Sequence, residues 1–216
     1  MQRAGSESWR FAEGVEELSH AALFVRDAVG LTPSAAADIP PRLTGQPPDR
    51  KAVLDAAARE EASLQWPRWW RAVLRWEACA QQGLTTGRAP WRDQLSAVAD
   101  PPDFANLADS PALQGAVQAT FSEACRWAGE RRRDVLPADD PALFGSRLAR
   151  DTAEEVAASR GVRLGIVQGC AVVLMVEGIW WARIGPGAVA CSVASVHDPQ
   201  TARSVLRAAF ESGVTS

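Results

Sequence analysis

The feature that most constrains the fold is a change of residue pattern at Gly161. Beyond it come runs rich in β-branched residues, separated by two or three residues that include glycine, at 162–167, 170–176, 179–184 and 188–196. Such runs are typical of strands, and such short connections allow neighbouring strands to pair only in antiparallel fashion. The pattern therefore predicts a four-stranded antiparallel β-meander.

The run at 170–176 is apolar at each position, so both faces of this strand must be covered. Asp198 and Pro199 predict the start of a last helix, because they combine an N-cap acceptor with a residue preset for the first helical turn. That helix can cover one face of the sheet. A helix expected at 141–160, the N-terminal helices or a second subunit must cover the other.

The first two thirds of the chain carry helical patterns. Apolar residues recur at steps of three and four from Phe11 to Val29, which predicts a helix at about 7–29 that ends at Gly30. Asp49 is expected to cap a second helix, and Pro67 to begin a third that ends before Gly83. Further helices are expected at 91–99, 111–133 and 141–160.

The segment 31–48 contains five prolines and one glycine, which predicts a long irregular loop, less ordered than its flanking helices. The predicted fold class is therefore α+β, mainly helical and closed by the meander and a C-terminal helix. A helical lobe at 1–135 and an α-β-β-β-β-α lobe at 136–216 are expected to pack as one unit, since 216 residues with 47% hydrophobic composition suffice for one sizeable core.

Charge and composition exclude several classes of function. The formal charge is −3, from 23 basic and 26 acidic residues, so no global field attracts nucleic acid or an anionic membrane. The four cysteines have no metal-ligand spacing, and neither a signal peptide nor an apolar run of membrane length is present. We expect a cytoplasmic protein without a cofactor, a metal or a phosphate-binding glycine loop.

A basic stripe with tryptophans beside it is the strongest candidate for a binding surface. Arg68, Arg71 and Arg75 share one face of a predicted helix that also carries Trp69 and Trp70. Arginine and tryptophan are enriched among the residues that dominate protein interfaces. The stripe favours an anionic neighbour, which is either internal or an external acidic partner or phosphate. An internal neighbour or a simply solvated face is favoured over an external one, because runs of charge are usually exposed faces.

The acidic residues Glu13, Glu16 and Glu17 are the expected internal neighbour, and they lie near His20. The spacing Glu17-x-x-His20 also occurs in metal-binding helical bundles, but a second such motif is missing. A solvated acidic face is therefore favoured over a metal site.

Near the last strand, Cys191, Ser195, His197 and Asp198 supply a thiol, a hydroxyl, an imidazole and a carboxylate, the groups used in nucleophilic catalysis. Structural roles are favoured, because catalytic partners usually come from separate segments of a chain and Asp198 already serves as a helix cap.

Adjacent tryptophans in the run 179–184 must point to opposite faces of the sheet. Trp180 shares an apolar face with Ala182 and Ile184, which predicts a position in the core under the last helix. Trp181 shares its face with Arg183, which predicts a second contact, either with the N-terminal helices or with another chain.

These observations favour a non-enzymatic interaction or regulatory protein, whose partner is another protein or a second copy of the chain. The alternative is an enzyme or small-ligand-binding protein with a pocket between the helical lobe and the sheet, to which His197 or the face from Glu13 to His20 contributes.

Overall fold

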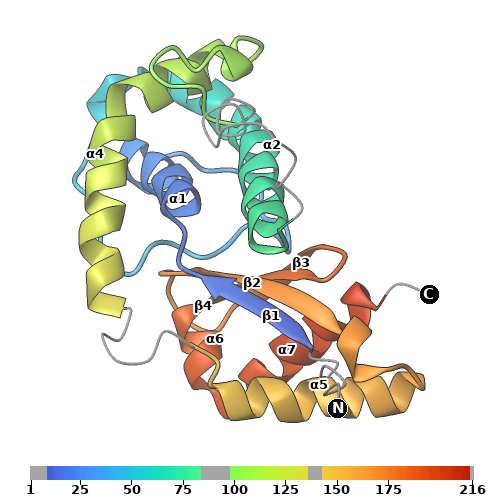
Figure 1. Cartoon of the computed structure of the whole chain (residues 1–216). Coiled ribbons are helices and arrows are strands. Elements are labelled where there is room, and N and C mark those ends of the chain that lie inside the picture. Colours follow the sequence, from blue (N-terminus) through green and yellow to red (C-terminus); the bar gives the residue numbers. More distant parts are fainter. Residues whose placement is uncertain (1–8, 84–97, 136–142, 215–216) are drawn as a thin grey trace.

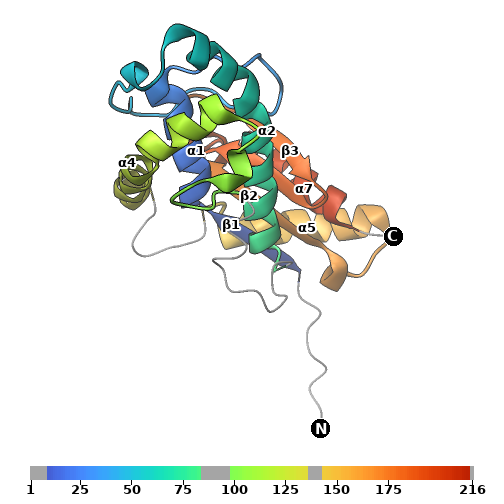
Figure 2. The ribbon, with the colours of Figure 1, turned by 90° about the horizontal axis from the view of Figure 1, so that it is seen from above.

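A sheet lies between two layers of helices in the computed structural model, which describes residues 9–83, 98–135 and 143–214 (Figure 1). The first layer contains α1 (Glu17–Val29), α2 (Ala56–Gln81) and α4 (Pro111–Val135). The second layer contains α5 (Ser146–Arg160), α6 (Val193–His197) and α7 (Pro199–Gly213). Seen from above, α1 and α2 cross over the strands (Figure 2).

The sheet is mixed, and the prediction of a purely antiparallel meander is wrong. Its strands are β1 (Arg10–Gly14), β2 (Gln168–Leu174), β3 (Trp181–Gly185) and β4 (Ala188–Ser192). They lie in the order β1-β2-β4-β3, in which β2 is parallel to both β1 and β4, and only β3 is antiparallel to its neighbour β4. The mixture of helices and strands agrees with the predicted class.

The connections explain why the meander fails. Only the β3–β4 hairpin is as short as expected, whereas the chain between β2 and β3 runs from Met175 to Trp180 and passes beyond the position that β4 then fills. This connection is held by the proline-rich segment, because Thr44 N–H donates to the Met175 carbonyl over 2.8 Å and Glu177 N–H donates to the Arg42 carbonyl over 2.9 Å.

The other two expected strands also differ. The run at 162–167 forms a short 3-10 turn, Leu164–Ile166, and the run at 188–196 is a strand only as far as Ser192, where α6 follows. Ser192 ends the strand because its hydroxyl caps α6, accepting a hydrogen bond from Ser195 N–H over 3.1 Å.

The predicted first helix is two elements. Residues Arg10–Gly14 form the edge strand β1, and α1 begins only at Glu17. The strand conformation is fixed by pairing with distant β2, with Arg10 opposite Gln168. The predicted helix end is confirmed, because Gly30 adopts the left-handed conformation at a φ of 75° and caps α1.

The remaining helices partly follow the predictions. Asp55 caps α2, accepting from Ala58 N–H over 2.8 Å, and α2 continues through Pro67 instead of beginning there. The predicted start of α4 at Pro111 is confirmed. The expected helix at 141–160 begins at Ser146, whereas nearly all of the helix expected at 91–99 lies outside the described residues.

Both faces of β2 are covered, as its apolar sequence predicted. Its residues from Gly169 to Leu174 are buried, with α7 on one face and α1 and α2 on the other (Figure 1). One apolar core extends through both helical layers and includes Phe24 and Trp66 as well as Leu174 and Phe210. The division into lobes at residue 135 stays a prediction.

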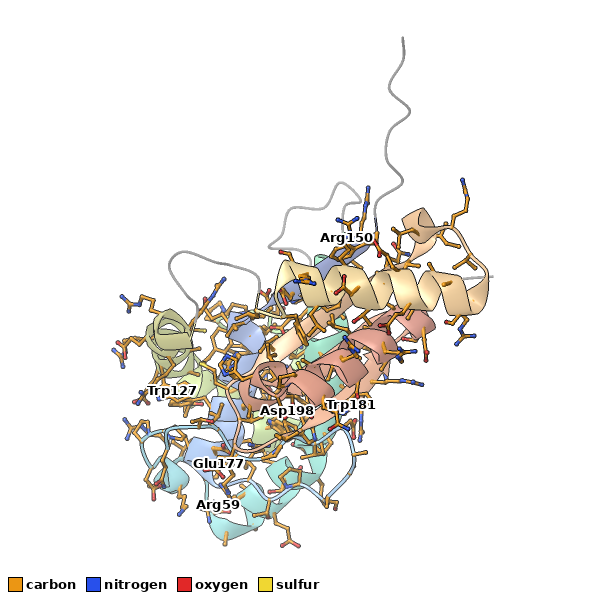
Figure 3. The ribbon with its side chains drawn as sticks, turned by 90° about the horizontal axis from the view of Figure 1, so that it is seen from below. Arg59, Trp127, Arg150, Glu177, Trp181 and Asp198 are labelled. Carbon is orange, nitrogen blue, oxygen red and sulfur yellow. The ribbon has the colours of Figure 1, made fainter. Side chains whose placement is uncertain are left out.

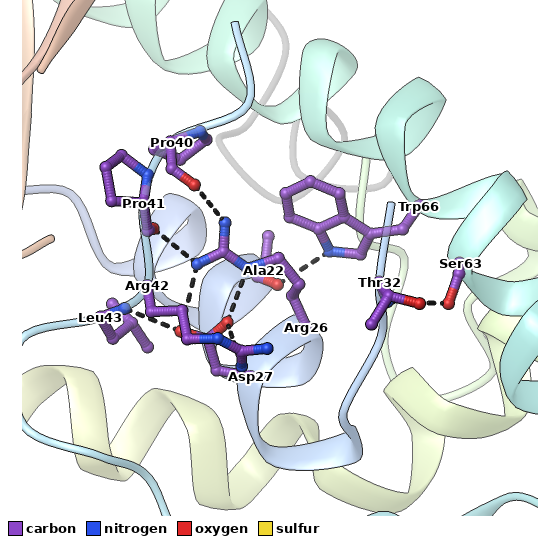
Figure 4. A network of polar contacts seen from close by, with 10 residues as sticks. All are labelled: Ala22, Arg26, Asp27, Thr32, Pro40, Pro41, Arg42, Leu43, Ser63 and Trp66. Atoms are coloured by element: carbon purple, nitrogen blue, oxygen red, sulfur yellow. Dashed lines mark hydrogen bonds and ion pairs between the residues drawn. The ribbon is translucent and has the colours of Figure 1, made fainter. Parts of the chain in front are cut away.

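The proline-rich segment lacks helix, as predicted, but it is bonded to α1 and α2 (Figure 4). Arg26 is 4% exposed and donates to the carbonyls of Pro40 and Pro41 over 2.6 and 2.7 Å. Its neighbour Asp27 accepts from Leu43 N–H over 2.7 Å. These bonds argue against the low order expected for this segment, because they fix its backbone at several points.

Candidate functional site

Trp69 and Trp70 of α2 point into the protein. Trp69 and Trp70 are 3% and 0% exposed, and their indole N–H groups donate to the carbonyls of Val98 and Asp38 over 2.7 and 2.8 Å. Trp70 also stacks on Trp66 with the ring centroids 5.4 Å apart. Their assignment to the binding surface is therefore wrong, because buried indoles with satisfied N–H groups cannot contact another molecule.

The arginine stripe divides into internal and external parts. Arg71 forms a bidentate ion pair with Asp38 of the proline-rich segment, and this hydrogen-bonded pair lowers the pKa of the Asp38 carboxyl. The internal anion is therefore Asp38 and not the expected cluster of glutamates. Arg68 and Arg75 are exposed and form no ion pair within the described residues.

The expected acidic face does not exist as one surface. Glu13 lies on β1, where its carboxylate accepts from Phe144 N–H over 3.1 Å, and Glu17 is exposed at the start of α1. His20 is 1% exposed and both its ring nitrogens are engaged, so it is not available to a metal shared with Glu17.

The tautomer of His20 follows from its bonds. Nε2 accepts from Met175 N–H over 2.9 Å, so Nδ1 carries the proton and donates to the Glu16 carbonyl over 2.6 Å. Burial lowers the pKa of the imidazole to about 4, which keeps the ring neutral. His20 thus joins α1 to the end of β2.

A second buried titratable group, Glu77, lies close by on α2. One carboxylate oxygen accepts from Ser19 N–H over 2.7 Å, while Oε2 has no partner within the described residues. Burial, with a smaller contribution from the nearby Glu16, raises the pKa of Glu77 to about 8. Glu77 lines neither of the two grooves described below.

The groups considered for nucleophilic catalysis are not assembled. Cys191 is fully buried in β4, and burial raises the pKa of its thiol far above the usual range. The Ser195 hydroxyl is buried and donates to the Trp180 carbonyl over 2.8 Å. His197 is exposed at the end of α6, and Asp198 caps α7 by accepting from Thr201 N–H over 2.8 Å. The structural reading of these residues is favoured.

The edge strand β3 is the surface that combines exposure with charge. It pairs with β4 only, and Arg183 in its centre is exposed without an ion pair to any other described residue. Trp181 lies beside the start of α7, close to Asp198 (Figure 3). Ile184 instead faces α2. The prediction placed the face of Trp180 and Ile184 under the last helix, but it is the face of Trp181 that lies there. Trp180, expected in the core, is only half-buried.

A groove lies on each side of β3, and Arg183 borders both. The larger, about 650 Å³, runs along α7 and is lined by Trp181, Pro199 and Leu148 together with Arg203 and Arg207. The smaller, about 250 Å³, lies between β3 and α2. It is lined by Asp38, Arg71, Leu74, Arg75, Arg183 and Ile184.

The two grooves together carry five arginines and only two carboxylates, Asp38 and Glu211, in a chain of net charge −3. Arg71, Arg203 and Arg207 contact Asp38, Glu155 or Glu211, so Arg75 and Arg183 supply the positive charge that can attract an anionic group. We call this surface, formed by Arg75, Trp181, Arg183, Arg203 and Arg207, the β3 edge. Of its residues the sequence singled out Arg75 and Trp181; the missed signal was the pair of arginines one turn apart on the last helix.

No family model, curated protein or solved structure matches the chain. Two further findings concern the described residues alone. None of their helices is long and apolar enough to cross a membrane. Their His, Cys, Asp and Glu side chains form no group of three that could hold a metal ion.

Proposed function

We propose that this chain is an interaction or regulatory protein without catalytic activity, and that it binds another protein through the β3 edge. One observation carries the proposal: Arg75 and Arg183 are exposed and form no ion pair with any other described residue, beside the outer edge of β3, on a chain that is acidic overall. The candidate nucleophiles are not accessible to a substrate. Cys191 is packed in the interior, and the buried Ser195 hydroxyl is hydrogen-bonded.

The test is a charge reversal. Arg75→Glu with Arg183→Glu places two negative charges at the β3 edge without breaking any ion pair of the described structure. Arg147→Glu with Arg150→Glu makes the same change in charge on α5, where both side chains are largely exposed. A partner that co-purifies from the source cells with the wild type and the α5 variant, but not with the edge variant, supports the proposal. Equal recovery with all three contradicts it.

The alternative function is that of a small-ligand-binding protein, and the smaller groove favours it in one respect. This groove lies between the helical layer and the sheet, and three arginines line it. A phosphorylated metabolite bound there would raise the melting temperature, by an amount that grows with the logarithm of its concentration divided by its Kd. A rise in the melting temperature of the wild type that is lost in the Arg75→Glu variant would favour ligand binding over protein interaction.

A further inference from the structure

The main chain of β3 has one paired and one unpaired side. The Trp180 carbonyl accepts from Ser192 N–H over 2.8 Å, and Ala182 lies opposite Ala190 in the same ladder. Along two antiparallel strands, residues that are hydrogen-bonded to the partner strand alternate with residues whose N–H and C=O groups point away from it. Trp181 and Arg183 therefore present their main-chain groups to the outer side of the sheet, where no described strand follows.

An unpaired strand edge is a template for another strand, and proteins usually block it with charges, prolines or a covering segment. At β3 such devices are limited to Arg183, a register shift between Arg183 and Gly185, and Pro186 in the turn that follows, so Trp181 to Arg183 is the part of the edge left for pairing. A second copy of the chain is disfavoured as the added strand, because symmetric pairing about the centre of β3 brings the two Arg183 side chains together. An acidic strand from another protein would avoid this repulsion between arginines.

The side chains of an added strand would alternate between the two grooves. On the α2 side they would meet Arg75, since Arg71 is already paired with Asp38, and Arg183 borders both grooves. On the α7 side they would meet Trp181 and Pro199. The arginines of that side, Arg203 and Arg207, already contact Glu155, so the α7 groove provides more apolar surface than free charge.

We propose that the β3 edge binds an extended acidic segment of a partner protein by adding it as a further strand, with acidic side chains toward α2 and apolar ones toward α7. This inference rests on the proposed function and specifies its partner. Main-chain hydrogen bonds to Trp181 and Arg183 would supply affinity, and the two grooves would supply specificity. At 3.4 Å per residue, the five residues of β3 accommodate a segment of about five residues.

The probe is a labelled ten-residue peptide of alternating Glu and Val, titrated into the full chain and followed by fluorescence anisotropy. We expect saturable binding that weakens as salt is added. The edge variant, Arg75→Glu with Arg183→Glu, should bind at least about tenfold more weakly, and the α5 variant should bind like the wild type. Amide hydrogen exchange, resolved by NMR, should slow at Trp181 and Arg183 when the peptide is bound.

Three control probes can overturn the inference. The first is a ten-residue peptide of alternating Lys and Val. If it binds as tightly as the Glu/Val peptide, the arginines do not select an acidic partner. A second control is the Glu/Val peptide with its consecutive central residues N-methylated, which removes their main-chain N–H donors along both edges of the peptide. If it binds as tightly as the unmethylated peptide, no strand is added. Tighter binding of an oligothymidine of ten nucleotides would make nucleic acid the ligand.

Two further outcomes separate this inference from the proposed function. A doubled mass in light scattering, with Trp181 and Arg183 amides protected before any peptide is added, would make a second copy the occupant and overturn the inference. Absence of peptide binding, together with a cellular partner that is lost in the edge variant, would overturn strand addition and leave the interaction function intact.

Discussion

The proline-rich segment and the β3 edge use the same residue type for opposite purposes. Arg26 is buried and donates to the carbonyls of Pro40 and Pro41, so it closes an irregular segment onto α1. Arg183 is exposed and has no ion pair within the described structure. Composition alone therefore does not distinguish arginines that stabilise this fold from those that are available to a partner.

The largest expected effect is on the internal arginine. Arg26→Met should lower the free energy of unfolding by about 3–5 kcal/mol, because it removes the buried ion pair of Asp27 and leaves the buried Pro40 carbonyl and the partly buried Pro41 carbonyl without their donor. The matched change Arg183→Met should stay within about 0.5 kcal/mol of the wild type. Urea unfolding measures both, and a similar loss in the two variants would remove the distinction between the regions.

The tryptophans extend the comparison to apolar contacts. Trp70→Ala should cost about 3–5 kcal/mol, since it removes a fully buried ring that anchors the Asp38 carbonyl. Trp181→Ala should cost less, because Trp181 is only half-buried. Thermal and urea unfolding check this order. A greater loss for Trp181 would indicate that the β3 edge belongs to the core.

The interior should also impose a pH dependence that the edge does not. Folded protein keeps the Glu77 proton up to a pH of about 8, its pKa in the folded state, whereas the unfolded chain releases it near the ordinary pKa of 4.5. The unfolded state binds fewer protons in this interval, so stability falls as pH rises.

His20 acts in the opposite sense. Its pKa is about 4 in the folded protein against 6.5 in the unfolded chain, so its contribution to stability rises between these values. The two effects offset each other from pH 4.5 to 6.5. From pH 6.5 to 8 Glu77 acts alone, and the wild type should lose about 2 kcal/mol. Glu77→Gln should abolish this loss in urea unfolding; an unchanged slope would assign it to another group.

The smallest expected effect separates two arginines of one helix. Arg71→Gln should cost about 0.5–1 kcal/mol, since it breaks a partly exposed ion pair with Asp38. Arg75→Gln should leave the melting temperature unchanged and weaken partner binding. If Arg75→Gln is the more destabilising variant, the boundary between internal and external arginines is misplaced.

Local signals predicted the elements that local interactions determine. The start of α4 at Pro111, the end of α1 at Gly30 and the cap of α7 at Asp198 follow from residues at the helix ends themselves. The continuity of α2 did not follow, because Pro67 lacks a donor and normally disturbs a helix. Burial of Trp66 and Trp70 on either side of Pro67 outweighs that cost.

The sheet could not be predicted in the same way. The sequence of β1, Arg-Phe-Ala-Glu-Gly, contains no β-branched residue, and its strand conformation depends on pairing with β2. The β3 edge was predicted only through Arg75 and Trp181. Arg183 lies two residues from Trp181 on β3, whereas Arg203 and Arg207 belong to α7, which only the folded chain brings beside that strand.

The pairing of Arg10 with Gln168 also determines when the fold can be completed. During synthesis on a ribosome, the residues of β1 emerge early, but their hydrogen-bonding neighbour emerges only after α1, α2, α4 and α5 have been made. Until then β1 has no strand to join. Contacts between such distant positions slow folding. The apolar side of the helical layer that faces the sheet therefore stays exposed, and accessible to chaperones, until the last third of the chain has been made.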